Sequence, residues 1–238
     1  NYTPLATVDV DSGLIVADDV IAGTHEASSL LPALKDVEES FGLEAVPDEV
    51  LADGMMATGE NLAACAEEHV TLYSPVPGTS KNNNPAIRDD PTQPVAEEDR
   101  KRLPTRKNTY EDVSWQQLDK HAFVYDPEED CYWCPEGKRL SYAEKSSETR
   151  RGKRVVRYRY HSDPADCAGC PLRESCMRPG VEKREVGHQQ HESHLVEQRK
   201  FMQTDAAREK YARRRSVGER PFAVIKQAFG VRQFLTRG

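Results

Sequence analysis

The chain has 238 residues, of which 37% are apolar and 31% charged, so the sequence predicts a folded, strongly solvated protein of one large domain or two small ones. No run of 18 apolar residues occurs, which excludes a typical membrane-spanning helix. The net charge of −7 is uneven: residues 1–100 carry 20 Asp and Glu against 4 Lys and Arg, whereas residues 101–238 carry 20 against 29. An acidic chain is a poor general binder of nucleic acid, but its basic second half can contact phosphates locally because salt screens charges beyond roughly 8–10 Å.

The first 22 residues are typical of a β-hairpin. LATVDV and GLIVADDVI are rich in Val and Ile and are separated by Asp11-Ser12-Gly13, a common turn sequence. Residues 26–41 then place apolar side chains at helical spacing, and Gly42 is expected to end that helix.

Two more strands and a helix are expected before residue 77. Residues 48–53 (DEVLAD) predict a short buried strand with Asp53 at its C-terminal end, and residues 70–76 (VTLYSPV) predict another. Between them, Thr58 is a candidate N-cap for a helix through ENLAACAEE. The order strand, strand, helix, strand, helix, strand is typical of an α/β sheet.

The periodic pattern ends near residue 78. Residues 77–109 hold several prolines, three consecutive asparagines and an acidic run, which predicts a long loop or disordered insertion. FVYDPEEDCYWCP and KRVVRYRYH indicate strands, and the sequence from about residue 188 is helical in pattern. We therefore divide the chain into a first core segment (1–78), a loop insertion (79–120), a cysteine-rich module (121–185) and a helical C-terminal segment (186–238).

Six cysteines occur, and five of them lie in the cysteine-rich module. Cys65 stands alone, and the other five are Cys131 and Cys134, Cys167 and Cys170, and Cys176. Pairs with a two-residue gap suit a metal ion better than a set of structural disulfides. No charged segment followed by an apolar core opens the sequence, so we expect no secretory signal and a reducing, cytoplasmic compartment.

A structural zinc ion is the first interpretation of these cysteines. Zinc takes four tetrahedral thiolate or imidazole ligands, and a two-residue gap lets two thiolates reach one ion from a tight turn. The two pairs would supply four ligands, which leaves Cys176 as a fifth thiol and His121 and His161 as substitutes. The alternative is a set of reduced cysteines that pack in the core.

Three histidines recur at every third position, at His188, His191 and His194. On a helix this spacing drifts slowly around one face. We favour an exposed polar helix over a metal site for this segment.

Glu219 is an acidic residue within a strongly basic segment near the C-terminus, after Arg213, Arg214 and Arg215. Arg215 and Glu219 are i and i+4, a spacing that gives an exposed ion pair worth only a few tenths of a kcal/mol. The other interpretation is a metal ligand beside a phosphate-binding surface, for which Asp53 would be the second acid. A strand-end Asp is equally typical of a turn or helix cap.

Taken together, these segments resemble a known family. VLADGMMATGENLAAC is similar to the strand that carries the second catalytic acid in DDE transposases of bacterial insertion sequences, and VGERPFAVIKQAFGVRQFLTRG to the segment carrying their final Glu. YWCPEGKRL with CAGCPLRESC resembles a cysteine-rich insertion between those two acids in one branch of the family. NYTPLATVD with GLIVADDV resembles the hairpin after the first catalytic strand, so the resemblance covers nearly the whole chain in the right order.

The resemblance implies a ribonuclease H-like α/β fold: a mixed sheet with flanking helices, interrupted by the cysteine-rich insertion. It implies that Asp53 is the second catalytic acid and Glu219 the third, both of them ligands of Mg²⁺ or Mn²⁺. The family spacing of Arg, Glu and Lys in the last segment fits Arg215, Glu219 and Lys226.

Two positions depart from the family pattern. Ala212 stands where relatives carry Tyr, and Tyr211 comes one residue early. The first catalytic acid of the family precedes the opening hairpin, and the resemblance places Asp9 at a non-catalytic position. Because the chain opens with Asn1, we expect it to begin after the first catalytic strand and so to lack one strand and one metal ligand.

The activity that the resemblance implies is cleavage of DNA at the ends of an insertion sequence and strand transfer into target DNA, with two metal ions about 3.5–4 Å apart. Arg213, Arg214 and Arg232 would join Arg215 and Lys226 in contacting DNA phosphates. DNA is the expected partner, a homodimer is the expected active form, and no membrane is involved. The alternatives are an inactive transposase remnant, a non-enzymatic zinc-bearing nucleic-acid-binding protein, and a nuclease of the same fold that only hydrolyses DNA.

Overall fold

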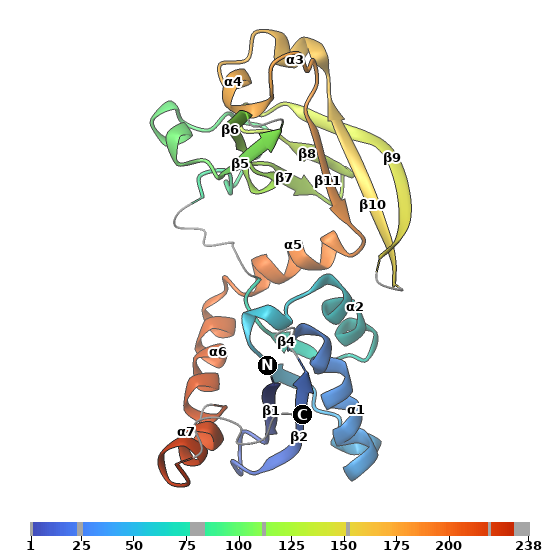
Figure 1. The fold of residues 1–238 in the computed structure, drawn as a ribbon, viewed down its shortest axis with the longest axis vertical. Coiled ribbons are helices and arrows are strands. Elements are labelled where there is room, and N and C mark those ends of the chain that lie inside the picture. Colours follow the sequence, from blue (N-terminus) through green and yellow to red (C-terminus); the bar gives the residue numbers. More distant parts are fainter. Residues whose placement is uncertain are drawn as a thin grey trace. The chain divides into compact units, whose positions relative to one another are not determined.

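The computed structural model describes residues 2–22, 26–76, 84–110, 113–150, 153–218 and 220–230. The chain forms two compact units, which are shown in Figure 1. One unit combines Asn1–Pro77 with Ser193–Gly238, and the other is Gly78–Glu192. The second unit is therefore an insertion between the two parts of the first.

The first unit opens with the predicted hairpin. Strands β1 (Tyr2–Val8) and β2 (Ile15–Ala22) pair antiparallel. Gly13 in the connecting turn has φ +73°, a left-handed conformation that glycine adopts without strain. Asp9 holds the turn, because its carboxylate accepts hydrogen bonds from the backbone N–H and the hydroxyl of Ser12.

Helix α1 (Leu30–Phe41) follows a single 3₁₀ turn (Glu26–Ser29), and its C-cap is Gly42, as the sequence predicts. Gly42 has φ +92° and donates its N–H to the carbonyl of Glu38. The helix therefore ends where a residue with a side chain would be strained.

The next elements are strand β3 (Glu49–Leu51), helix α2 (Gly59–Glu67) and strand β4 (Thr71–Tyr73). Strands β3 and β4 pair parallel, with α2 as their crossover connection. Thr58 caps α2 by accepting a hydrogen bond of 3.2 Å from the N–H of Asn61, which confirms the predicted N-cap. The unit has a small apolar core, whose buried members are Leu30, Leu62, Cys65, Val70 and Leu72.

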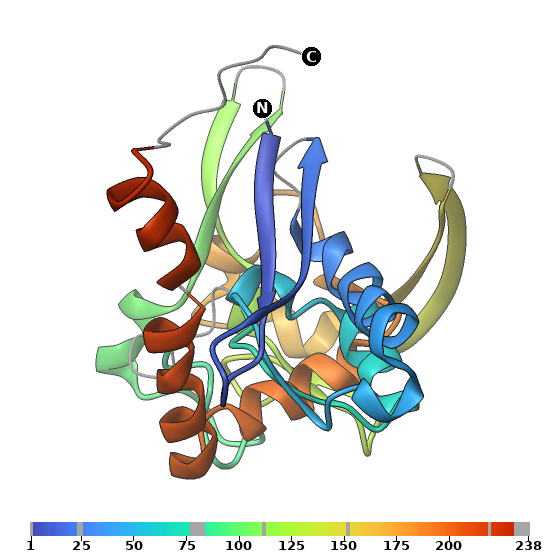
Figure 2. The same cartoon turned by 90° about the horizontal axis from the view of Figure 1, so that it is seen from below.

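Three helices return the chain to the first unit: α5 (Glu192–Phe201), α6 (Asp205–Val217) and α7 (Arg220–Gln227). The buried side chain of Gln198 donates hydrogen bonds to the carbonyls of Leu72 (2.8 Å) and Ser74 (2.9 Å). These bonds fasten α5 to the end of β4. In Figures 1 and 2 the β1–β2 hairpin lies between α1 and the pair α6 and α7.

The second unit is built on an antiparallel sheet with the strand order β11-β10-β9-β8-β7. Its strands are β7 (Val124–Asp126), β8 (Cys131–Trp133), β9 (Arg139–Arg150), β10 (Lys153–Ser162) and β11 (Glu185–Gln189). The sequence predicts β7, β8 and β10 but misses β9, because RLSYAEKSSETR lacks the Val and Ile that mark strands. Pairing with β10 sets the structure of this segment. Helices α3 (Pro164–Ala168) and α4 (Arg173–Cys176) connect β10 to β11.

The loop prediction for residues 79–120 is wrong for the part that the structure describes. From residue 84 onward this segment contains a 3₁₀ helix (Glu97–Arg102) and a two-stranded hairpin of β5 (Thr105–Tyr110) and β6 (Val113–Leu118). The side chains of Val95, Leu103 and Leu118 are buried in the core of the second unit. Their irregular spacing gives no periodic signal, yet they pack against the sheet.

A close backbone contact ties this segment to the turn after β8. Val95 donates its N–H to the carbonyl of Pro135 at 2.7 Å, and Arg88 Nη2 donates to the carbonyl of Cys134 at 2.8 Å. Gly137 has φ +71°, and a Cβ atom there would lie 2.0 Å from the carbonyl oxygen of Thr92. Only glycine therefore permits both the turn and the approach of the neighbouring segment.

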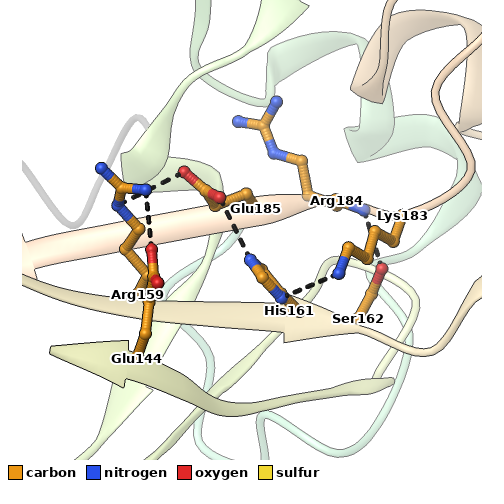
Figure 3. A network of polar contacts seen from close by, with 7 residues as sticks. All are labelled: Glu144, Arg159, His161, Ser162, Lys183, Arg184 and Glu185. Atoms are coloured by element: carbon orange, nitrogen blue, oxygen red, sulfur yellow. Dashed lines mark hydrogen bonds and ion pairs between the residues drawn. The ribbon is translucent and has the colours of Figure 1, made fainter.

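A chain of polar contacts crosses β9, β10 and β11, as Figure 3 shows. Arg159 lies 2.8 Å from Glu144 and 3.8 Å from Glu185. Glu185 also contacts His161 Nε2 at 3.1 Å, and Lys183 Nζ lies 3.1 Å from Nδ1 of the same ring. Both ring nitrogens of His161 thus face a charged side chain, Glu185 or Lys183, which opposes its predicted use as a substitute zinc ligand.

Within the described part of the chain, no helix is both long enough and apolar enough to cross a membrane.

Candidate functional site

A groove of about 890 Å³ in the first unit contains three of the predicted site residues: Asp53, Arg213 and Arg214. Its walls are β1 with its following turn, β3, α1, α6 and the start of α7. Acidic side chains come from the strand side and basic side chains from α6. The groove therefore brings together the two kinds of residue that the sequence places far apart.

Asp53 lies just after β3, and each of its carboxylate oxygens has a partner. Oδ1 accepts a hydrogen bond of 3.0 Å from the N–H of Met55, so Asp53 caps the short 3₁₀ turn that follows. Oδ2 lies 3.2 Å from Nη2 of Arg214. The side chain of Asp53 is 45% exposed, so it is fixed in position and still reachable from solvent. The cap interpretation of Asp53 is confirmed, and its role as a metal ligand stays a prediction.

The basic residues of α6 point in different directions. Arg214 contacts Asp53, and Arg213 Nη2 lies 3.7 Å from Asp11 Oδ1 beyond the end of β1. Arg215 is exposed and, unlike the two preceding residues, Arg213 and Arg214, does not line the groove. Lys226 on α7 is also exposed. The predicted DNA-contacting residues thus include two beside the acids and two on open surface.

One cluster that includes two residues of the groove lining was not predicted from the sequence. Lys210 forms an ion pair with Glu49 at the start of β3, and its Nζ lies 5.4 Å from the centre of the Tyr73 ring. Tyr73 also donates a hydrogen bond of 3.0 Å to Glu49, and both donors lower the pKa of Glu49. The sequence feature that could have predicted this cluster is the i, i+4 spacing of Lys210 and Arg214, which places both side chains on one face of α6.

Tyr211 is close to the pair of Asp53 and Arg214. Burial raises the pKa of its hydroxyl, with the negative charge of Asp53 adding to the rise and the positive charge of Arg214 opposing it. Tyr211 therefore shares the electrostatic environment of Asp53, although it comes one residue before position 212, where relatives of the resembled family carry Tyr.

Asp9 lies in the groove but serves the hairpin turn. The hydroxyl and N–H of Ser12 lower the pKa of its carboxyl group, so the ionised form is the one that holds the turn. This structural role agrees with the non-catalytic position predicted for Asp9. Glu219 and Arg232, the predicted third acid and one predicted DNA contact, lie outside the described residues.

No group of three or more His, Cys, Asp or Glu side chains within the described residues is close enough to hold a metal ion. Asp53 contributes one carboxylate, and Arg214 neutralises part of its charge. The described residues therefore do not form a complete magnesium site by themselves.

All six cysteines are free thiols. Burial raises the pKa of Cys176 to about 12, and the nearby thiols of Cys134, Cys167 and Cys170 contribute to that shift. Burial also raises the pKa of Cys131, to about 11, but its other influences come from Arg139 and from carboxylates. Four of the five clustered cysteines therefore influence one another, and Cys131 is separate from them.

The predicted exposed helix over the three histidines is wrong. His188 belongs to β11 and is buried, with Nδ1 at 2.9 Å from the hydroxyl of Tyr132. His191 has φ +70° between β11 and α5, and His194 lies on α5. The period of three misled the prediction because the segment changes from strand to helix. Burial lowers the pKa of His188 to about 4, so the imidazole is neutral in the folded protein.

Residues 133–238 match a family model described as a transposase DDE domain. The match begins in β8 and runs to the end of the chain, and it supports a DDE-type transposase, a class of proteins that bind DNA and generally use a divalent metal ion. No curated protein and no solved structure matches the chain. The mixed α/β content with several sheets is in accord with this class.

Proposed function

We propose that this chain carries out the DNA cleavage and strand transfer of a bacterial insertion sequence, with Asp53 and Glu219 as catalytic acids. The observation that carries the proposal is the contact between Asp53 and Arg214 in a groove with Arg213. A second support comes from the family match, which covers the segment with Glu219 but begins after Asp53.

The fold proposed for the first unit is ribonuclease H-like. An antiparallel hairpin, a helix, a parallel pair of strands with a crossover helix and a return by further helices support it. The second unit, with its cysteines, would be the insertion between the two acids.

The chain's own residues would act by charge and position. Arg214 holds the carboxylate of Asp53 in a defined orientation and reduces the repulsion between that carboxylate and a DNA phosphate. Arg213, Arg215, Lys226 and Arg232 would contact phosphates without reading sequence. Two copies would act together, one on each end of the element. The described residues do not form a complete metal site by themselves.

The zinc prediction has no support in the described geometry, because no group of three or more potential ligands within the described residues is close enough to hold a metal ion. Metal analysis of the purified chain tests whether zinc is bound.

Cleavage and strand transfer are tested with the purified full chain, a labelled duplex carrying the element's end and Mg²⁺ or Mn²⁺. The proposal expects the wild-type chain to nick and join DNA, and it expects Asp53→Asn and Glu219→Gln each to abolish both reactions. The Asp9→Asn variant should retain them. Cleavage that survives Asp53→Asn overturns the assignment of the site. Cleavage without joining would favour a nuclease, and DNA binding without either reaction would show that this chain does not catalyse alone.

A further inference from the structure

Strands β9 and β10 extend beyond the rest of their sheet in the second unit, as Figure 1 shows. β8 pairs with β9 only at residues 139–141, and β11 pairs with β10 only at residues 157–161. Beyond these positions the two strands pair with each other and with no other strand among the described residues. We call this part, residues 142–150 with 153–156, the outer ribbon. A two-stranded ribbon with both faces in water is only marginally stable, so a bound partner would stabilise it.

The charges of the outer ribbon differ between its two faces. Side chains alternate between the faces along a strand, so the register of β9 and β10 assigns each residue to one face. On the first face, acids and cations compensate each other. Arg157, at the base of the ribbon, lies 3.2 Å from Glu148. Arg159 lies 2.8 Å from Glu144, as Figure 3 also shows.

The second face of the outer ribbon carries cations without acids. Lys145 and Arg154 lie on it, one on each strand, with Ser147 between them along the ribbon and Thr149 opposite Arg154. All four side chains are exposed. Lys145 Nζ lies 5.3 Å from the centre of the Tyr158 ring, so these two residues share this face. The register places no Asp or Glu on this face of the outer ribbon, and its positive charge is therefore available to an anionic partner.

The dimensions of this face match the major groove of duplex DNA. Neighbouring strands lie about 4.8 Å apart, and a major groove about 12 Å wide admits a two-stranded β-ribbon with its side chains. Lys145 and Arg154 are four residues apart along the ribbon, which is about 13 Å. Because they lie on opposite strands, each can approach a different one of the two phosphate backbones that border the groove. The hydroxyls of Ser147 and Thr149 would then face the edges of the bases.

We propose that the outer ribbon binds duplex DNA by inserting its second face into the major groove. Lys145 and Arg154 contact phosphates on the two DNA strands, and the ion-paired first face points away from the DNA. Residues 150–153 are Arg, Arg, Gly and Lys, so the sequence at this end of the hairpin adds three cations and no acid. The outer ribbon shares no residue with the groove that contains Asp53. The inference rests on DNA as the partner of this class of protein and does not depend on catalysis by Asp53 or Glu219.

Binding is measured by fluorescence anisotropy with the purified full chain and a labelled duplex of about 20 base pairs of arbitrary sequence. EDTA is present, so the result does not depend on cleavage. The double variant Lys145→Gln with Arg154→Gln should bind about tenfold more weakly than wild type at about 0.1 M salt. The steepness of log affinity against log salt should fall by about 2, because two phosphate contacts are lost. The double variant Lys145→Arg with Arg154→Lys keeps both charges and should bind as wild type.

The matched control is the double variant Lys101→Gln with Lys138→Gln. It removes the same charge from two exposed residues of the same unit, outside the outer ribbon, and should bind as wild type. Equal weakening by this control would show that only the net charge of the chain matters, and it would overturn the inference.

The groove that is contacted can be identified on the wild-type complex with dimethyl sulfate. This reagent methylates guanine N7 in the major groove and adenine N3 in the minor groove. We expect protection of guanine N7, averaged over the duplex, with unchanged reactivity of adenine N3 as the internal control. The inference is overturned if adenine N3 is protected in place of guanine N7, or if single-stranded DNA of the same length competes as well as the duplex. An acidic peptide that competes as well as the duplex would also overturn it, by assigning the ribbon to a protein partner.

Discussion

Arg214 Nη2 lies 3.2 Å from Asp53 Oδ2, although 161 positions separate the two residues in the sequence. The contact joins the end of β3 to the last turn of α6, a helix that follows the whole inserted unit. It is the geometric reason to treat the two basic residues of α6 and the strand-end acid as one site.

The strength of this contact is measurable by a double-mutant cycle of Asp53→Asn and Arg214→Gln. Both side chains are partly exposed, so we expect a coupling free energy of about 0.2–1 kcal/mol in urea unfolding. Arg208→Gln in place of Arg214→Gln should show no coupling with Asp53→Asn. A coupling of zero for Arg214 itself would mean that the contact with Asp53 contributes nothing to stability.

His188 makes stability depend on pH. Its pKa is about 4 in the folded state and about 6.5 in the unfolded state, so the unfolded chain binds more protons between these values. The free energy of unfolding should therefore fall as the pH is lowered from 6.5 to 4, and His188 should account for on the order of 3 kcal/mol of that fall. Above pH 7 His188 should add no pH dependence.

Urea unfolding of wild type and His188→Gln at several pH values checks this expectation, since the variant should lose most of the slope. The control is His69→Asn, because His69 is exposed, and this variant should keep the wild-type dependence of stability on pH. Equal slopes for wild type and His188→Gln would show that other groups cause the pH dependence.

Gly137→Ala should be strongly destabilising. The new Cβ would lie 2.0 Å from the Thr92 carbonyl oxygen, and φ +71° adds backbone strain of about 1–3 kcal/mol. Gly180→Ala is the matched control, because φ is +81° there but no atom lies within 4 Å of the new Cβ. Thermal unfolding should show the larger loss for Gly137→Ala, and equal losses would mean that the segment 84–95 does not pack against this turn.

The clustered thiols should be unreactive in the folded chain. With pKa values of about 12 for Cys176 and about 11 for Cys131, almost no thiolate is present at pH 7.5. Iodoacetamide at that pH should leave both residues unmodified in native protein and modify all six cysteines in urea. Rapid native modification of Cys176 would show that its thiol is more accessible to solvent than the partly buried position described for it.

The sequence was sufficient where a local signal and the tertiary structure agree. The Asp11-Ser12-Gly13 turn, the end of α1 at Gly42 and the Thr58 cap are each set by residues within one turn, and all three are confirmed. The position of Asp53 at the end of a strand follows from the same kind of signal.

Prediction failed where distant residues decide the structure. Segment 84–118 is organised by burial of scattered apolar side chains against a sheet that comes later in the chain, and β9 exists because it pairs with β10. The Lys210–Glu49 pair required knowledge of which face of α6 meets β3. His188 was misplaced because a spacing of three fits a helix, while its actual environment is a tyrosine on another strand.

The bonds from Gln198 to the carbonyls of Leu72 and Ser74 close the chain around the inserted unit, across sequence separations of 126 and 124 residues. The entropy cost of closing even a fully flexible loop rises only with the logarithm of its length, by about 0.6 kcal/mol for each doubling. We therefore expect that the insertion can vary widely in length and sequence while Arg214 on α6 still contacts Asp53. The number of residues that separates Asp53 from Arg214 in the sequence can therefore change with little effect on the contact between them.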